Sequence, residues 1–111
     1  RYAVTGRDGQ VARALAERAA AHGVTIVPLG RPELDLARPE TILPALAAAR
    51  PDAILSVAAY TAVDQAESEA ATAFAVNAEG AAAIGRAAAA LGVPVVHLST
   101  DYVFDGTKAA P

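Results

Sequence analysis

The sequence predicts an α/β protein with a doubly wound parallel sheet and helices on both faces. Short apolar runs typical of buried strands alternate with stretches of helical periodicity along the whole chain. The first run leads directly into a glycine-containing turn and a helix, as in nucleotide-binding α/β units. Alanine accounts for 31 of the 111 residues and aromatic residues for 5%, which favours closely packed helices. This length suits one domain with its own core.

The first element is an expected strand over residues 1–5, followed by the turn Thr5-Gly6-Arg7-Asp8-Gly9-Gln10-Val11-Ala12. Gly6 permits a tight turn, and Gly9 lets the backbone approach a pyrophosphate with no Cβ in the way. Ala12 is small enough for close packing of a helix on a sheet. The helix that runs to about His22 directs its first amides outward, where they form a site for a phosphate. The turn therefore predicts dinucleotide binding.

The second strand is expected over residues 24–29, and Arg31 follows it. An NAD-preferring site usually carries an acidic residue at the end of this strand, where it accepts the ribose hydroxyls. No acid stands at positions 29–31. Arg31 either faces an adenosine 2′-phosphate, which favours NADP(H), or is an exposed loop arginine, and both interpretations stay open.

A very short third strand is expected over residues 33–35, before a helix from Glu40 to about Arg50. Pro39 suits the first position of that helix, because its missing N–H would have no partner there. Asp35 either caps the following helix or accepts a hydrogen bond from an adenine amino group beside Leu36. The spacing alone favours capping.

The fourth strand, residues 53–58, ends in the small residues Ala58 and Ala59, then Tyr60 and Thr61. Ligands of open α/β sheets bind at the carboxyl ends of the strands, and small side chains leave room for a dinucleotide there. The acidic stretch 64–69 has no histidine companions, so a solvated face is favoured over a metal site.

A long helix is expected over residues 70–91, with Phe74 and Asn77 on its inward face. A buried Asn must be hydrogen-bonded, so Asn77 is expected to tie this helix to the backbone of the neighbouring strand. The last strand, residues 93–99, carries His97 among apolar residues, which predicts a core histidine with a structural role.

Hydroxyls and a carboxylate gather where that last strand ends, in Ser99-Thr100-Asp101-Tyr102-Val103-Phe104-Asp105-Gly106. A hydroxyl there can hydrogen-bond a substrate carbonyl and stabilise the oxyanion that forms as hydride arrives. The alternative is a turn in which these side chains only satisfy the backbone. Spacing does not decide between the two.

Composition and charge exclude several functions. The net charge is −3, the isoelectric point is about 5.2 and no basic stripe appears, so a nucleic-acid partner is not expected. No apolar run approaches the ~18–20 residues of a membrane span, and no signal peptide is visible. Cysteine is absent, which excludes disulfides and fits a cytoplasmic protein.

The motifs TGRDGQVA, ELDL, AAYTAVDQAE, FAVNAEG and HLSTDYVFDG, in this order, resemble the dTDP-4-dehydrorhamnose reductases, a branch of the extended short-chain dehydrogenases/reductases. The resemblance covers essentially the whole chain. It fits a Rossmann-type sheet of five strands in the order 3-2-1-4-5 with right-handed crossovers. It implies reduction of the 4-keto group of a dTDP-sugar with NADP(H) or NAD(H), and it allows a divalent cation such as Mg²⁺ and a homodimer.

The resemblance also implies roles for individual residues. Thr100 is expected to be the catalytic hydroxyl and, with Asp101, to contact the substrate sugar. The family's Tyr-x-x-x-Lys pair is missing, because residues 6, 64 and 106, four after each tyrosine, are Gly, Asp and Gly. The expected cofactor-binding residues are Gly6, Gly9, Gln10, Val11, Arg31, Asp35, Leu36, Ala58, Ala59, Tyr60, Thr61 and Ser99.

The missing pair and the position of both chain ends give a prediction about the parent protein. Residues 1–111 are expected to form an incomplete NAD(P)-binding domain, with the proton donor and the sugar-binding part beyond Pro111. As it stands, this piece is expected to bind nucleotide without turnover. Two other functions share the scaffold: a non-catalytic NADP-binding subunit resembling the methionine adenosyltransferase regulatory subunit, and another nucleotide-sugar epimerase or dehydratase.

Overall fold

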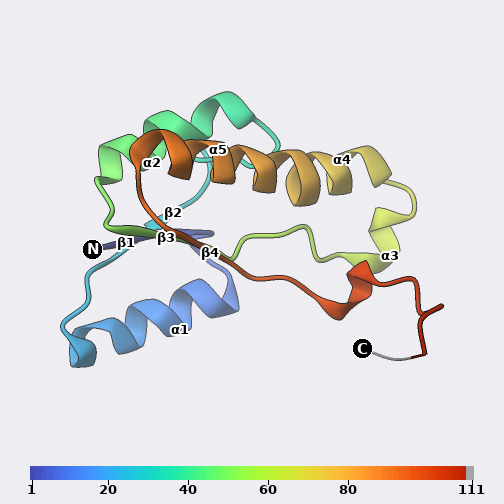
Figure 1. Ribbon diagram of the computed structural model, residues 1–111, viewed down its shortest axis with the longest axis horizontal. Coiled ribbons are helices and arrows are strands. Elements are labelled where there is room, and N and C mark those ends of the chain that lie inside the picture. The colour runs from blue at the N-terminus through green and yellow to red at the C-terminus, as the bar shows by residue number, and fades with distance from the viewer. Residues whose placement is uncertain (110–111) are drawn as a thin grey trace.

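A four-stranded parallel sheet forms the centre of the molecule in the computed structural model, which describes residues 1–109 (Figure 1). Its order is β2 (Ile26–Leu29), β1 (Tyr2–Thr5), β3 (Ala53–Ser56) and β4 (Val95–His97). In register, Tyr2 lies opposite both Ile26 and Ala53. Four of the five expected strands and their relative order are therefore confirmed, in a parallel α/β sheet.

The expected third strand, residues 33–35, is wrong, because this segment lies in a loop. Its backbone amides are used locally: Leu34 N donates to Gly30 O at 2.9 Å, and Asp35 N donates to Thr41 Oγ1 at 2.9 Å. The Asp35 carboxylate accepts from Ala37 N at 3.0 Å. These turn hydrogen bonds replace the ladder that a strand would need.

Helices cover both faces of the sheet, as expected. Figure 1 shows α1 (Gln10–Ala19) alone on one face, and α2 (Ile42–Ala49) with α5 (Ala81–Leu91) on the other. Short 3-10 turns, at Ala20–His22 and Pro39–Thr41, extend α1 and precede α2. The expected helices to about His22 and over 40–50 are thus confirmed.

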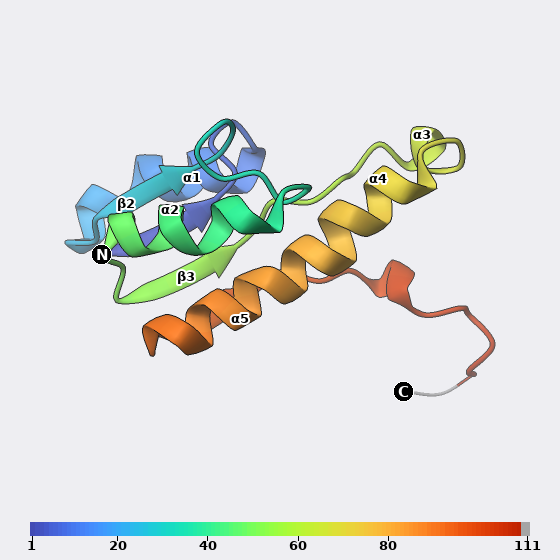
Figure 2. The ribbon, with the colours of Figure 1, turned by 90° about the horizontal axis from the view of Figure 1, so that it is seen from above.

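The long helix expected over residues 70–91 is continuous but changes its winding. Helix α4 (Ala70–Phe74) passes through a π-helical segment, Ala75–Gly80, into α5. The wider π turn breaks the 3.6-residue periodicity, and Figure 2 shows α4 projecting past the end of the sheet, toward the short helix α3 (Val63–Ala66). Phe74 is therefore 70% exposed, and its expected inward position is wrong.

The core lies between the sheet and the α2–α5 layer. Ile54 of β3, Ile42 and Leu46 of α2, and Ile84 of α5 are completely or almost completely buried. Each such side chain contributes about 1.5–3 kcal/mol on burial. Helix α1 covers the opposite face with the buried methyl group of Ala12.

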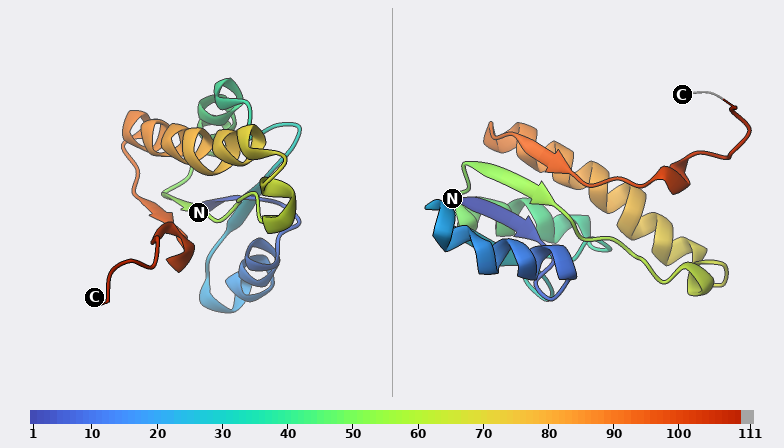
Figure 3. Two further views of the ribbon diagram at one scale, coloured as in Figure 1. Left: turned by 90° about the vertical axis from the view of Figure 1, so that its right-hand side faces the viewer. Right: turned by 90° about the horizontal axis from the view of Figure 1, so that it is seen from below.

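Strand β4 forms one edge of the sheet, and its residues are exposed. His97 was expected in the core, but it is exposed, because no strand flanks β4 on its outer side in the described part of the chain. Its Nδ1 lies 3.0 Å from the buried Ser56 Oγ, so its expected structural role holds without the expected burial. Figure 3 shows β4 leading from this edge into the C-terminal segment.

Candidate functional site

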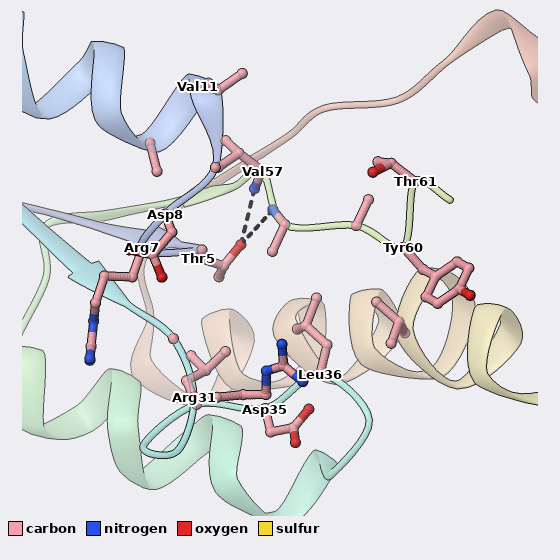
Figure 4. A pocket seen from close by; sticks show the side chains of 18 of the residues that line it. Thr5, Arg7, Asp8, Val11, Arg31, Asp35, Leu36, Val57, Tyr60 and Thr61 are labelled. Atoms are coloured by element: carbon pink, nitrogen blue, oxygen red, sulfur yellow. Dashed lines mark hydrogen bonds between the residues drawn. The ribbon is translucent and has the colours of Figure 1, made fainter. Parts of the chain in front are cut away.

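A cleft of about 1130 Å³ lies at the carboxyl ends of the strands (Figure 4). This is the edge where open parallel sheets bind ligands. Eleven of the twelve residues expected to bind a cofactor line it, and Ser99 does not. The eleven are Gly6, Gly9, Gln10, Val11, Arg31, Asp35, Leu36, Ala58, Ala59, Tyr60 and Thr61.

One end of the cleft is the turn between β1 and α1. Gly6 has φ +91°, a conformation that L side chains rarely adopt, and a Cβ there would meet Ala58 Cβ at 3.4 Å. A Cβ on Gly9 would meet nothing within 4 Å, so the space in front of α1 is open. Gly9 caps α1 without any side-chain hydrogen bond to its first amides. These amides have no side-chain acceptor, so they can donate hydrogen bonds to an anion such as a phosphate.

The floor of the cleft depends on Thr5, which the sequence pattern did not predict as a site residue. Its side chain is fully buried, and its Oγ1 accepts hydrogen bonds from Val57 N at 3.0 Å and Ala58 N at 3.1 Å. Figure 4 shows both bonds. Thr5 thus joins the end of β1 to the segment that leaves β3. Its only sequence signal is its place as the last residue of the first strand.

Asp35 and Leu36 line the cleft beyond the end of β2. The expected capping role of Asp35 is wrong, since its carboxylate bonds Ala37 N and α2 has no side-chain cap. Leu36 lies against the π-helical segment, where a Cβ on Gly80 would come within 2.6 Å of Leu36 O. The loop and the helix therefore touch with no room for a methyl group.

Two arginines flank the end of β2. Figure 4 shows the Arg31 side chain extending into the cleft toward Leu36, whereas Arg7 points away from Arg31. Arg7 Nη2 donates to Glu33 Oε2 at 2.8 Å. The pKa of Glu33 is lowered by a hydrogen bond from its own backbone amide and by Arg7. No local pattern in the sequence predicts this pair, because its members are 26 residues apart.

Tyr60 and Thr61 form the opposite wall. The Asn77 side chain holds the Tyr60 backbone through two hydrogen bonds, from Tyr60 N at 2.8 Å and to Tyr60 O at 3.0 Å. Asn77 thus ties the long helix to the chain leaving β3, as predicted, although it is exposed and not buried. Tyr60 Oη donates to Glu69 Oε2 at 2.6 Å, and this bond raises the pKa of Tyr60.

Thr100 and Asp101 lie beyond the end of β4, on the same edge of the sheet but outside the cleft lining. Two strand spacings of about 4.8 Å separate β4 from β1. Thr100 Oγ1 accepts from Tyr102 N at 3.3 Å and donates to Asp101 Oδ1 at 3.3 Å. The hydroxyl thus takes part in a strand-end turn and remains exposed.

Other site types receive no support from the structure. In residues 1–109, no three His, Cys, Asp or Glu side chains are arranged to hold a metal ion. No helix in the same residues has the length and apolar character needed to cross a membrane. The remaining residues that line the cleft are Thr5, Arg7, Asp8, Ala12, Gly30, Leu34, Ala37, Val57, Thr72 and Val76.

The fold and the cleft together define the class, a Rossmann-type α/β domain whose ligand site is built on a glycine turn. Comparison with known proteins is more specific. The chain belongs to the family described as the RmlD substrate-binding domain, whose model matches residues 1–111.

Individual relatives agree with this assignment. Over its whole length the chain is 58% identical to the dTDP-4-dehydrorhamnose reductase of Sinorhizobium fredii, of which it covers 37%. It is 50% identical to that of Burkholderia thailandensis, covering 97% of this chain and 36% of the relative. A solved structure of the Bacillus anthracis dTDP-4-dehydrorhamnose reductase in complex with NADP matches with a TM-score of 0.87 and 36% identity, over 96% of this chain and 38% of that one. The chain thus spans little more than a third of these proteins.

Proposed function

We propose that this chain is the dinucleotide-binding part of a cytoplasmic reductase that converts dTDP-4-dehydro-L-rhamnose to dTDP-L-rhamnose with NADPH or NADH. One observation carries the proposal: after the glycine turn, the uncapped N-terminus of α1 faces the cleft at the carboxyl ends of the strands. The relatives' names supply the reaction.

The residues present fit a dinucleotide. The first amides of α1 have no side-chain acceptor, so they would hold the pyrophosphate. Leu36 and Asp35 would contact the adenine, while Ala59, Tyr60 and Thr61 would lie toward the ribose and nicotinamide. When bound, the reduced nicotinamide supplies hydride to C4 of the sugar.

The hydroxyl of Thr100 is proposed to polarise the 4-keto oxygen as hydride reaches C4, and Asp101 to contact the sugar. A proton must then reach O4 to complete the new hydroxyl group. None of the three tyrosines is followed four residues later by Lys, so the proton donor is placed outside residues 1–111. The pocket for the sugar is likewise placed largely outside them.

The test uses the full-length protein, with dTDP-4-dehydro-L-rhamnose and each reduced cofactor in turn. Loss of reduced-nicotinamide absorbance with formation of dTDP-L-rhamnose is the expected result. Binding of NADP⁺ without turnover would refute the enzyme and favour a regulatory subunit. Thr100→Ala is expected to lower kcat about a hundredfold, as for loss of one oxyanion donor, while Thr100→Ser retains the hydroxyl and most of the rate.

A further inference from the structure

Glu33 lies in the loop after β2 and forms an ion pair with Arg7, which lines the proposed cofactor site. We infer that Glu33 sets the discrimination between NADPH and NADH, by pairing with Arg7 and weakening the attraction of this guanidinium for a 2′-phosphate. This inference rests on the proposed cofactor site. It concerns which of two cofactors that site prefers.

The pair is accessible to a ligand. The Arg7 and Glu33 side chains are 44% and 56% exposed, and Arg7 lines the cleft beside the end of β2. An anion arriving there meets a guanidinium whose Nη2 is already given to Glu33 Oε2, 2.8 Å away. This bond uses one of the five N–H donors of the guanidinium, but the carboxylate neutralises the charge that would attract a phosphate and holds the guanidinium toward itself.

The backbone explains why the acid stands at position 33 and not directly after the strand. A Cβ added to Gly30 would meet Arg7 Cβ at 3.2 Å and Arg7 N at 3.4 Å. The usual place for a ribose-binding carboxylate is thus filled by the glycine turn itself. Glu33 supplies a carboxylate to the same corner from the next turn of the loop, through its bond to Arg7.

The other charged groups of the cleft form no acid–cation pair comparable to Arg7–Glu33 among the residues that the structure describes. Arg31 extends toward Leu36, away from Arg7 (Figure 4), and no ion pair involves it in the described part of the chain. Asp35 is turned onto Ala37 N, and Asp8 lies in the glycine turn itself. Glu33 is therefore the acid whose removal would free a cation for a 2′-phosphate.

The test measures binding of two probes to the full-length protein, 2′,5′-ADP and 5′-AMP, which differ in the 2′-phosphate alone. Glu33→Gln is expected to tighten 2′,5′-ADP by about two- to fivefold, the range of a half-exposed ion pair. The affinity of the same variant for 5′-AMP is expected to be unchanged or lower. Arg7→Gln is expected to weaken 2′,5′-ADP by about five- to tenfold with little effect on 5′-AMP.

A matched control separates the local effect from the change in net charge. Glu40→Gln removes the same charge from another exposed pair, Arg38–Glu40 at 3.1 Å, whose members do not line the cleft. The ratio of the two dissociation constants is expected to stay at the wild-type value in this variant. Thermal unfolding of all the variants confirms that each one is folded.

The possible failures are distinguishable. If the wild-type protein binds both probes and Glu33→Gln changes their ratio no more than Glu40→Gln does, the cofactor site stands and this inference is refuted. An unchanged ratio in Arg7→Gln refutes it as well. If the wild-type protein binds neither probe, the proposed cofactor site is wrong and the inference fails with it.

Discussion

Gly80 offers the sharpest test of how the helical layer shapes the cleft. It lies in the π-helical segment with helical backbone angles, φ −62° and ψ −46°, so alanine meets no conformational obstacle. Helix propensity alone would make Gly80→Ala stabilising by about 0.8–1 kcal/mol. The tertiary contact predicts the opposite sign.

The magnitude follows from the contact with Leu36. The new Cβ would stand 2.6 Å from Leu36 O and 2.8 Å from Leu36 Cβ, whereas ordinary contact begins near 3.4 Å. The helix or the loop must therefore move by roughly 0.8 Å, and overpacking of this kind costs about 1–3 kcal/mol. After subtraction of the helix-propensity gain, Gly80→Ala is expected to lower the free energy of unfolding by up to about 2 kcal/mol.

Gly85→Ala is the matched control, since the same change in the same helix places a Cβ with nothing within 4 Å. It is expected to raise the free energy of unfolding by about 0.5–1 kcal/mol. Urea denaturation of both variants in the full-length protein measures the difference. Binding of 5′-AMP is expected to weaken severalfold only in Gly80→Ala, because Leu36 lines the cleft. Equal shifts in the two variants, or a more stable Gly80→Ala, would refute the reasoning.

Three further predictions concern the floor and the wall of the cleft. Thr5→Val leaves two partly buried amides, Val57 N and Ala58 N, without an acceptor and is expected to lower the free energy of unfolding by about 2–4 kcal/mol, measured by urea denaturation. Thr5→Ser retains most of the stability, and equal losses in the two variants would contradict the hydrogen-bond account. Asn77→Ala is expected to speed amide exchange of Tyr60 N relative to α5, and unchanged exchange would mean that other contacts hold this wall. Glu69→Gln is expected to lower the pKa of Tyr60, followed by NMR of labelled tyrosine. The pKa of Tyr60 is raised in the folded state, so the stability contributed by this bond is fully present below the unfolded-state pKa near 10. That stability is lost as pH rises through the folded-state pKa. A Tyr60 pKa that does not fall in Glu69→Gln would exclude Glu69 as the cause of the raised pKa.

The order of strands and helices was predictable because it depends on local patterns. Apolar runs, the glycine turn and the alanine-rich helices each carry their signal within a few residues. The prediction of a strand over residues 33–35 was wrong because an alternation of apolar and polar side chains over only three residues fits a turn equally well. Asp35 and Thr41 supply side-chain oxygens to nearby amides, and such bonds compete with strand pairing.

The site was predictable on the phosphate side and less so elsewhere. The spacing of Gly6 and Gly9 predicts an anion site, and in the structure the N-terminus of α1 is uncapped and faces open space there. The Arg7–Glu33 pair arises only because the fold brings Gly30 against Arg7. The π-helical segment likewise has no local signal in the sequence, so the outward position of Phe74 was not foreseen.

The two walls of the cleft differ in how firmly they are anchored. The wall formed by the glycine turn continues directly from β1, whose Val4 and Thr5 are fully buried. From residue 57 to residue 79 no residue is buried, and α4 projects beyond the sheet (Figure 2).

Local opening of a segment requires little free energy where few apolar contacts must be broken. The wall from Tyr60 to α4 therefore depends on hydrogen bonds, such as those between Asn77 and the Tyr60 backbone, more than on apolar burial. Loss of a single hydrogen bond is thus expected to loosen this wall more than the phosphate end, which is anchored in the buried sheet.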